Sequence, residues 1–206
     1  MRGGLVLAGG LSTRMGVRKS LLTLNSKPFI AIITETLLKV ADEVVVAIGY
    51  SDDPTTYSNV LPRSIRVIKD EVEGHTPLIG ILTGLSHMHS TYSAILSCDL
   101  PFTRSQVLEL LFKRADEFDA AIPQWPTGRI EPLHAIYRVN PTKEAARKAF
   151  SSGGLKNTDM IESLTRVNYV HVDEIRPLDP QLLSFFNINI PQDLKKAKKI
   201  ASKNLC

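Results

Sequence analysis

Strand-like and helix-like segments alternate along most of this chain of 206 residues, and that order restricts the folds open to it. Short runs rich in apolar residues at 65–68 and 93–97 are each followed by a stretch with helical character, and glycine, proline, aspartate or serine stands at the junctions. A β-α-β order favours parallel strands covered by helices on both faces. The sequence therefore predicts an α/β fold with three layers around a mostly parallel central sheet.

The individual elements follow from the same pattern. Strands are expected at 4–8, 43–48, 65–68, 93–97, 119–122, 132–137, 167–172 and 185–188. Helices are expected at 28–40, 77–89, 103–115, 141–150 and 157–164, and Pro191 opens a last one. Thr103 and Asn157 are the expected N-caps of two helices, and Gly80 and Gly84 weaken the pattern of a third. Because no repeat or linker composition is visible, residues 1–206 are expected to form a single domain.

The charge of the chain gives little sign of a nucleic-acid partner. The formal net charge is only +4, and much of the excess lies in a lysine cluster near the C-terminus. Its members are Lys195, Lys196, Lys198, Lys199 and Lys203. Such a run is typical of the solvated face of a terminal helix, and no aromatic residues are interleaved with it to stack on bases. We therefore expect no binding to nucleic acid.

The cysteines and apolar runs point to a reducing compartment. Cys98 lies in an apolar run and is expected to be a buried thiol, and with Cys206 it makes no disulfide framework. No stretch reaches the length needed to cross a membrane, and no secretory signal is visible. A cytoplasmic protein without membrane association is the expectation.

A glycine-rich, cationic segment follows the first strand. Glycine permits positive φ and lets backbone N–H groups approach a ligand closely, while an arginine and a lysine supply charge for phosphate oxygens. The predicted triphosphate-binding residues of this segment are Leu7, Ala8, Gly9, Gly10, Arg14, Gly16 and Lys19. A Walker A loop is excluded because Arg18 stands where a glycine must precede the lysine. A dinucleotide fingerprint is excluded because no Gly-x-Gly-x-x-Gly spacing occurs.

Polar residues follow several of the expected strands. Ligands of such sheets bind beyond the carboxyl ends of the strands, so Asp70 and Asp99 are expected near the glycine-rich segment. A carboxylate suits a hard cation, and Asp99 is the first candidate to hold Mg²⁺. A turn or capping role ahead of Thr103 is the alternative for Asp99, and a turn role is the alternative for Asp70.

Three further side chains are candidates at the same edge. Asn187 and Asn189 stand at the end of the last expected strand, with one residue between them. One is then expected to meet the metal or the phosphates, and the other to tie down a loop. Glu131 is expected to orient Arg14, Lys19 or the second substrate, or else to cap the turn that follows it.

Motifs along nearly the whole chain resemble the MobA-type nucleotidyltransferases. They are Leu-Ala-Gly-Gly-x-Ser-x-Arg-Met-Gly-x-x-Lys at 7–19, Asp70 with Pro-Leu-Ile-Gly-Ile at 77–81, Cys-Asp-Leu-Pro at 98–101, Glu-Pro-Leu at 131–133, and Asn-Ile-Asn-Ile-Pro-Gln-Asp-Leu at 187–194. The family has a Rossmann-like fold, and its nearest members are the molybdenum cofactor guanylyltransferases. The resemblance implies one nucleotidyltransferase domain over 1–206.

The resemblance also implies a reaction. A phosphate oxygen of molybdopterin would attack the α-phosphorus of GTP, releasing pyrophosphate and leaving the guanine dinucleotide cofactor. Arg14 and Lys19 would stabilise the leaving pyrophosphate, and Mg²⁺ held by Asp99 would assist. Asp70 would contact the nucleoside. The resemblance further suggests contact with other molybdenum cofactor biosynthesis proteins.

Departures from the family motifs leave the substrates open. Thr76 replaces the usual glycine before Pro77, near the nucleobase pocket, and Ile190 replaces the usual threonine. CTP as donor, a different phosphorylated acceptor such as a sugar phosphate, and a nucleotide-binding regulator without turnover are the alternatives. The polar, glycine-bearing stretch at 151–159 is a weaker candidate for contacts with the acceptor.

Overall fold

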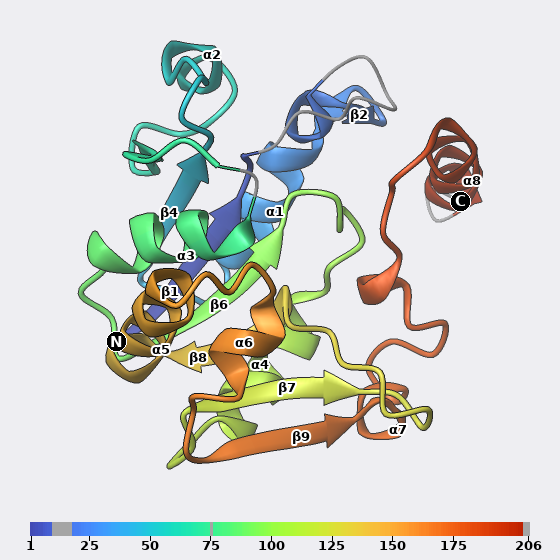
Figure 1. The fold of residues 1–206 in the computed structure, drawn as a ribbon. Coiled ribbons are helices and arrows are strands. Elements are labelled where there is room, and N and C mark those ends of the chain that lie inside the picture. Colours follow the sequence, from blue (N-terminus) through green and yellow to red (C-terminus); the bar gives the residue numbers. More distant parts are fainter. Residues whose placement is uncertain (10–17, 75, 204–206) are drawn as a thin grey trace.

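A twisted sheet of seven strands organises the described part of the chain, and the computed structural model describes residues 1–9, 18–74 and 76–203. Across the sheet the order is β5 (Arg66–Lys69), β4 (Glu43–Ile48), β1 (Arg2–Leu7), β6 (Tyr92–Ser97), β8 (His134–Arg138), β7 (Ala120–Gln124) and β9 (Val167–His171). β8 runs antiparallel to both β6 and β7, and the other neighbouring pairs are parallel (Figure 1). The predicted mostly parallel sheet is confirmed.

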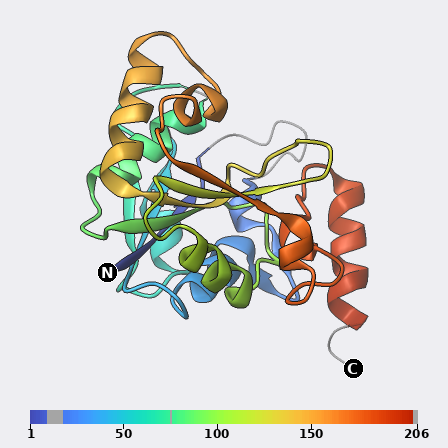
Figure 2. The ribbon, with the colours of Figure 1, turned by 90° about the horizontal axis from the view of Figure 1, so that it is seen from below.

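Helices cover both faces of this sheet. One face holds α3 (Pro77–Ser86), α5 (Val139–Ser151) and α6 (Asn157–Ile161), whose apolar residues share one core cluster. The other face holds α1 (Phe29–Leu37), α4 (Ser105–Arg114) and the short α7 (Val172–Ile175), which share a second cluster. Figure 2 shows the three layers edge-on. The predicted three-layer α/β architecture is confirmed.

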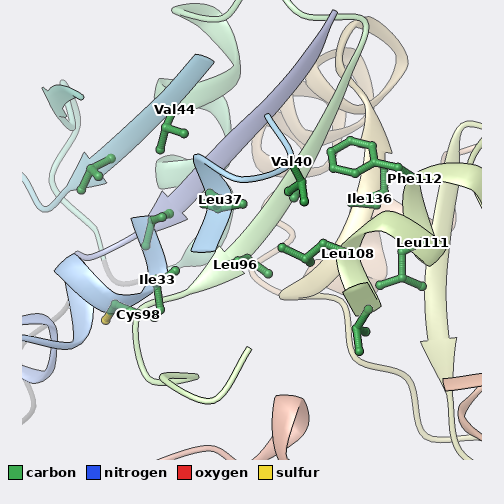
Figure 3. Packing of buried hydrophobic residues seen from close by; sticks show 14 of the residues in the cluster. Ile33, Leu37, Val40, Val44, Leu96, Cys98, Leu108, Leu111, Phe112 and Ile136 are labelled. Carbon is green, nitrogen blue, oxygen red and sulfur yellow. The ribbon is translucent and has the colours of Figure 1, made fainter. Parts of the chain in front are cut away.

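The two cores arise from alternation along the strands. In β1, Val6 belongs to the cluster under α1 and α4, whereas Leu5 and Leu7 belong to the cluster under α3 and α5. Figure 3 shows the α1 and α4 side, where Ile33 and Leu108 point toward the sheet and are fully buried. Each such aliphatic side chain stabilises the fold by about 1.5–3 kcal/mol. Successive strand residues therefore supply both layers at once.

A third, smaller cluster holds the C-terminal helix. α8 (Pro191–Lys203) lies apart from the two helical layers (Figures 1 and 2) and buries Ala197 and Ala201 against Leu24, Phe29 and Ile188. Leu24 lies in a hairpin of β2 (Thr23–Leu24) and β3 (Lys27–Pro28). The five lysines of α8 are exposed, as expected for a solvated face. None of the described helices combines the length and apolar character needed to span a lipid bilayer.

The predicted strand at 185–188 is wrong. The chain forms a 3-10 helix, η2 (Leu183–Phe185), and then runs to α8 without joining the sheet in the described structure. Its one ladder-like contact is the Ile188 N–H donated to the Asp99 carbonyl at 3.0 Å. The apolar pattern that resembles a strand arises because Ile188 packs in the cluster under α8. A buried side chain and an extended backbone do not by themselves require strand pairing.

Both predicted N-caps are also wrong. Arg104 occupies the N-cap of α4, and the Thr103 hydroxyl instead donates to the Leu100 carbonyl at 2.9 Å. Lys156 occupies the N-cap of α6, and Asp159 accepts N–H bonds from the residues that precede the helix. Thr103 lies in the tight turn after β6, where its side chain forms a hydrogen bond to a nearby backbone carbonyl and does not accept one from a helix N–H.

Two glycines bring α3 close to β1. A Cβ at position 84 would lie 2.2 Å from Leu5 Cδ1 and 3.0 Å from its Cγ, and Leu5 is fully buried. A Cβ at position 80 would lie 3.2 Å from Leu7 Cδ2, a contact that a small shift relieves. Gly84 therefore serves close packing of a helix on a strand, although glycine weakens the helix itself.

We expect Gly84→Ala to lower the free energy of unfolding by about 1–2 kcal/mol, because overpacking outweighs the gain in helix propensity. The matched variant Gly80→Ala should leave the stability unchanged or raise it by up to about 1 kcal/mol. Urea unfolding of both variants checks this. Equal stability of the two variants would contradict close packing at Gly84.

A buried histidine couples the stability of the fold to pH. His134 is 1% exposed, meets the Phe185 ring edge-on at 4.9 Å, and has no hydrogen-bond partner for either ring nitrogen among the described residues. Burial lowers the pKa of His134 to about 4, and the nearby Asp179 opposes that shift. In the unfolded chain the imidazole of His134 would bind a proton near pH 6.5, whereas in the folded chain the same imidazole stays neutral at that pH.

The folded state should therefore lose stability as pH falls from about 6.5 toward 4. At pH 5 the loss from this residue alone is about 2 kcal/mol. The variant His134→Leu removes this titration, so its unfolding free energy should fall less between pH 7 and pH 5 than that of the unchanged protein. Parallel denaturation curves at the two pH values measure the difference, and identical losses would exclude a buried neutral imidazole.

Candidate functional site

Three of the residues singled out in the sequence meet at the carboxyl edge of the parallel strands. Lys19 opens the 3-10 helix η1 (Lys19–Leu21), Asp99 follows β6, and Asn189 precedes α8. Lys19 Nζ lies 3.2 Å from Asp99 Oδ2 and donates to Asn189 Oδ1 at 2.5 Å. Residues separated by 80 and 170 positions along the chain thus form one polar cluster.

The ion pair in this cluster is partly shielded from water. The Lys19 side chain is 23% exposed and that of Asp99 is 12% exposed. Attraction between charges is stronger at such a site than on an open surface. The second carboxylate oxygen, Asp99 Oδ1, is buried and has no hydrogen-bond partner in the described part of the chain. A buried acceptor left unpaired is costly, so this oxygen marks a position where a ligand or a cation fits.

Helix α8 fixes the backbone around Asn189. Asp193, in the first turn of α8, accepts the N–H groups of Asn189 and Ile190 at 3.0 and 3.1 Å. Asn187 does not reach Lys19, and its amide donates to the Phe185 carbonyl at 3.4 Å. The two asparagines therefore make different contacts, one toward the polar cluster and one within its own loop.

Asp70 lies at the same edge but makes other contacts. It follows β5, and its N–H donates to the Ile48 carbonyl at 2.9 Å. Burial raises the pKa of the Asp70 carboxyl, with the Thr83 side chain lowering it and the charge of Asp52 raising it. Asp70 Oδ1 is buried without a hydrogen-bond partner among the described residues. It is thus a second acceptor available to a ligand, separate from the cluster around Lys19.

Glu131 organises its own loop. Its Oε1 accepts from Trp125 Nε1 at 2.7 Å and from an Arg129 guanidinium nitrogen at 2.8 Å, while Arg129 stacks on the Trp125 ring at 4.7 Å. The structure shows no ion pair between Glu131 and Lys19 among the described residues. The predicted role of Glu131 in orienting Arg14 stays a prediction, because Arg14 lies outside the described residues.

The beginning of the glycine-rich segment is tightly packed. Leu7 and Ala8 are buried, and a Cβ at Gly9 would lie 3.0 Å from the backbone nitrogen of Gly49. A side chain at position 9 would press on this backbone, so glycine suits the place where β1 ends beside the loop that follows β4. The predicted phosphate-binding residues Gly10, Arg14 and Gly16 lie outside the described residues.

Thr76 has a structural role that the sequence pattern did not predict. Its hydroxyl oxygen accepts the Leu78 N–H at 3.2 Å, so Thr76 is the N-cap of α3. The same hydroxyl donates to the Leu155 carbonyl at 2.7 Å. Thr76 thereby connects the start of α3 to the stretch at 151–159, which was a candidate for acceptor contacts.

Four residues near Lys19 were missed as site components. Arg18 forms an ion pair with Asp52, and Ser20 Oγ lies 3.0 Å from the Tyr57 hydroxyl. Burial raises the pKa of Tyr57, so its hydroxyl stays protonated. No motif signals these pairs, because each joins side chains more than thirty positions apart.

Comparison with known proteins defines the family. The family model described as the MobA-like NTP transferase domain matches residues 4–167. A probable molybdenum cofactor guanylyltransferase of Methanosarcina mazei is 37% identical over 199 residues, covering 94% of this chain and 88% of that protein. One of Methanothermobacter thermautotrophicus is 38% identical over 196 residues, covering 92% and 95%.

A solved structure agrees over almost the full length. The molybdopterin-guanine dinucleotide biosynthesis protein A of Archaeoglobus fulgidus superposes with a TM-score of 0.82 at 30% identity, covering 98% of this chain and 99% of that one. The predicted nucleotidyltransferase fold is thereby confirmed. From the matched model, the sequence relatives and the shared fold, the chain belongs to the MobA-like NTP transferase family.

Proposed function

We propose that this protein transfers GMP from GTP to the phosphate of molybdopterin, releasing pyrophosphate and forming the guanine dinucleotide cofactor. The observation on which the proposal depends is the contact of Lys19 with Asp99 and Asn189 at the carboxyl edge of the sheet. The names of the relatives from Methanosarcina and Archaeoglobus support the choice of guanine and molybdopterin.

The reaction needs alignment and charge neutralisation. An acceptor phosphate oxygen forms a new bond to the α-phosphorus, and the bond between the α-phosphorus and the bridging oxygen breaks, so that pyrophosphate leaves with the electron pair. The acceptor oxygen is already ionised, and no strong general base is required. Lys19 supplies positive charge close to the leaving phosphates, which stabilises the charge that develops there.

Asp99 is the residue that would hold Mg²⁺. Its Oδ1 is buried and unpaired among the described residues, and a carboxylate oxygen suits a hard cation. When bound, the ion would neutralise phosphate charge and polarise the α-phosphate. Asn189 keeps Lys19 beside Asp99, so that the lysine and the carboxylate face the same substrate.

We expect Lys19→Ala and Asp99→Ala each to lower the rate of pyrophosphate release by about 10²–10³-fold, because each removes charge stabilisation from the transition state. Circular dichroism should show an intact fold in both. The control Lys27→Ala removes a surface lysine paired with Glu35 and should turn over normally. Near-normal turnover of either site variant would refute the assignment.

The choice of base and acceptor is tested by a nucleotide panel. Binding of GTP, CTP, ATP and UTP is measured with Mg²⁺, followed by pyrophosphate release with molybdopterin and with a sugar phosphate. We expect GTP to bind most tightly and to release pyrophosphate only with the pterin. A preference for CTP or for a sugar phosphate would replace the proposed substrates, and binding without any release would indicate a regulator.

The variant Thr76→Gly extends this panel. The Thr76 hydroxyl already has two protein partners, so it is not free to select a base. Restoring glycine should keep the GTP preference and lower the stability by about 1–2 kcal/mol, since glycine is an acceptable N-cap but the bond to the Leu155 carbonyl is lost. A switch of base preference in this variant would identify Thr76 as a specificity residue instead.

A further inference from the structure

Two contacts flank Lys19 in the chain, one on each side. The residue before it, Arg18, forms an ion pair with Asp52. The residue after it, Ser20, shares a hydrogen bond of 3.0 Å with the hydroxyl of Tyr57. Both partners belong to one stretch, the 49–57 segment, which runs from the end of β4 into the helix α2 (Thr55–Ser58).

The 49–57 segment is itself firmly placed. Asp52 is 8% exposed, its N–H donates to the Gly49 carbonyl at 2.9 Å, and its Oδ2 accepts the Gly49 N–H at 3.2 Å. Tyr57 is fully buried in the cluster under α1 and α4. The contacts to Arg18 and Ser20 therefore come from groups that are fixed by packing and by backbone bonds, and not from a freely moving surface loop.

The 3-10 helix η1 needs such external support. It is one turn long and has no side-chain cap, with N–H bonds from Leu21 to the Arg18 carbonyl and from Leu22 to the Lys19 carbonyl, both at 3.1 Å. A single turn is unstable by itself. Ser20 is 1% exposed, so the turn is buried through the residue next to the lysine.

We infer that the 49–57 segment is a clamp on η1 that positions Lys19 for nucleotidyl transfer. The clamp orients the turn through Arg18 and Ser20, and Lys19 between them then reaches Asp99 and Asn189. Asp52 and Tyr57 are positioning residues and touch no reacting atom. The inference rests on the proposed function, because it concerns the lysine to which that function assigns charge stabilisation.

The consequence for the rate follows from geometry. A displacement of a charged group by about 1 Å lowers turnover by up to about 10²-fold. Removal of one of the two clamp contacts leaves the other in place, so a smaller loss of roughly tenfold is expected. Because Asp52 and Tyr57 come from a different segment, substituting them leaves the phosphate-binding stretch of the sequence unchanged.

The test uses Tyr57→Phe and Asp52→Asn in the full-length protein. Tyr57→Phe removes only the hydroxyl and alters no charge. It therefore leaves the electrostatic surroundings of Asp70 unchanged, whereas Asp52→Asn removes a charge that acts on Asp70. Ser20→Ala removes the same hydrogen bond from the other side and serves if Tyr57→Phe does not fold. Tyr92→Phe and Asp173→Asn are the matched controls, since the Tyr92 hydroxyl donates to the Phe118 carbonyl and Asp173 pairs with Arg176, both outside the 49–57 segment.

Two readouts are measured on each variant. One is the rate of pyrophosphate release with GTP and molybdopterin. The other is the rate of reductive methylation of the Lys19 amine, read by peptide mass spectrometry, which requires no substrate. An amine held by Asp99 and Asn189 reacts slowly, and a displaced amine reacts faster.

We expect both clamp variants to label several-fold faster at Lys19 and to turn over roughly tenfold more slowly, with the controls unchanged. A change in labelling without a change in turnover, or the reverse, would overturn the inference, as would no change in either. If the unchanged protein releases no pyrophosphate with any acceptor, the proposed function fails. In that case faster labelling still supports the positioning of Lys19 by the clamp, and unchanged labelling overturns it.

Discussion

The contact of Lys19 with Asp99 and Asn189 joins three separate parts of the fold. Asp99 is placed by β6, which lies beside β1 in the parallel part of the sheet, so the loops after both strands leave from the same edge. Asn189 is placed by α8, through the bonds of Asp193 to the backbone before the helix. Lys19 is placed by a single helical turn that is buried through Ser20. This polar cluster therefore forms where the sheet, the C-terminal helix and the turn η1 come together.

The same edge of the sheet holds polar atoms that no other described residue pairs. Asp99 Oδ1 and Asp70 Oδ1 are both buried without hydrogen-bond partners in the described chain. Each such acceptor costs about 1–3 kcal/mol of stability. The cores under the two helical layers make that cost tolerable, because they bury aliphatic side chains on both faces of β1. The layers contribute the stability, and the two oxygens without partners among the described residues lie at the edge where the proposed substrate and Mg²⁺ would bind.

The sequence predicted the layers better than the site. Strands such as 43–48 are recognisable because β-branched residues buried on both faces leave no helical period, and the structure has β4 at the same residues. Asp99 was predictable because a carboxylate ends a buried strand ahead of a proline turn. The strand at 185–188 was not, since burial under α8 imitates burial in a sheet. Arg18 and Ser20 have partners more than thirty positions away, and pairing at that distance is visible only once β1 and β4 are adjacent.

The small cluster under α8 explains why the C-terminal segment reaches the site without being a strand. Ile188 packs with Leu24 and Phe29, and these two residues follow shortly after Lys19 in the chain. The cluster therefore joins the segment that holds Asn189 to the segment that holds Lys19 by apolar contact, independently of the sheet ladder. Polar contact between Lys19 and Asn189 is then formed between two backbones that are already held together. Residues two apart in a regular strand share one face, whereas this irregular segment lets Asn189 contact Lys19 while Asn187 bonds within its own loop.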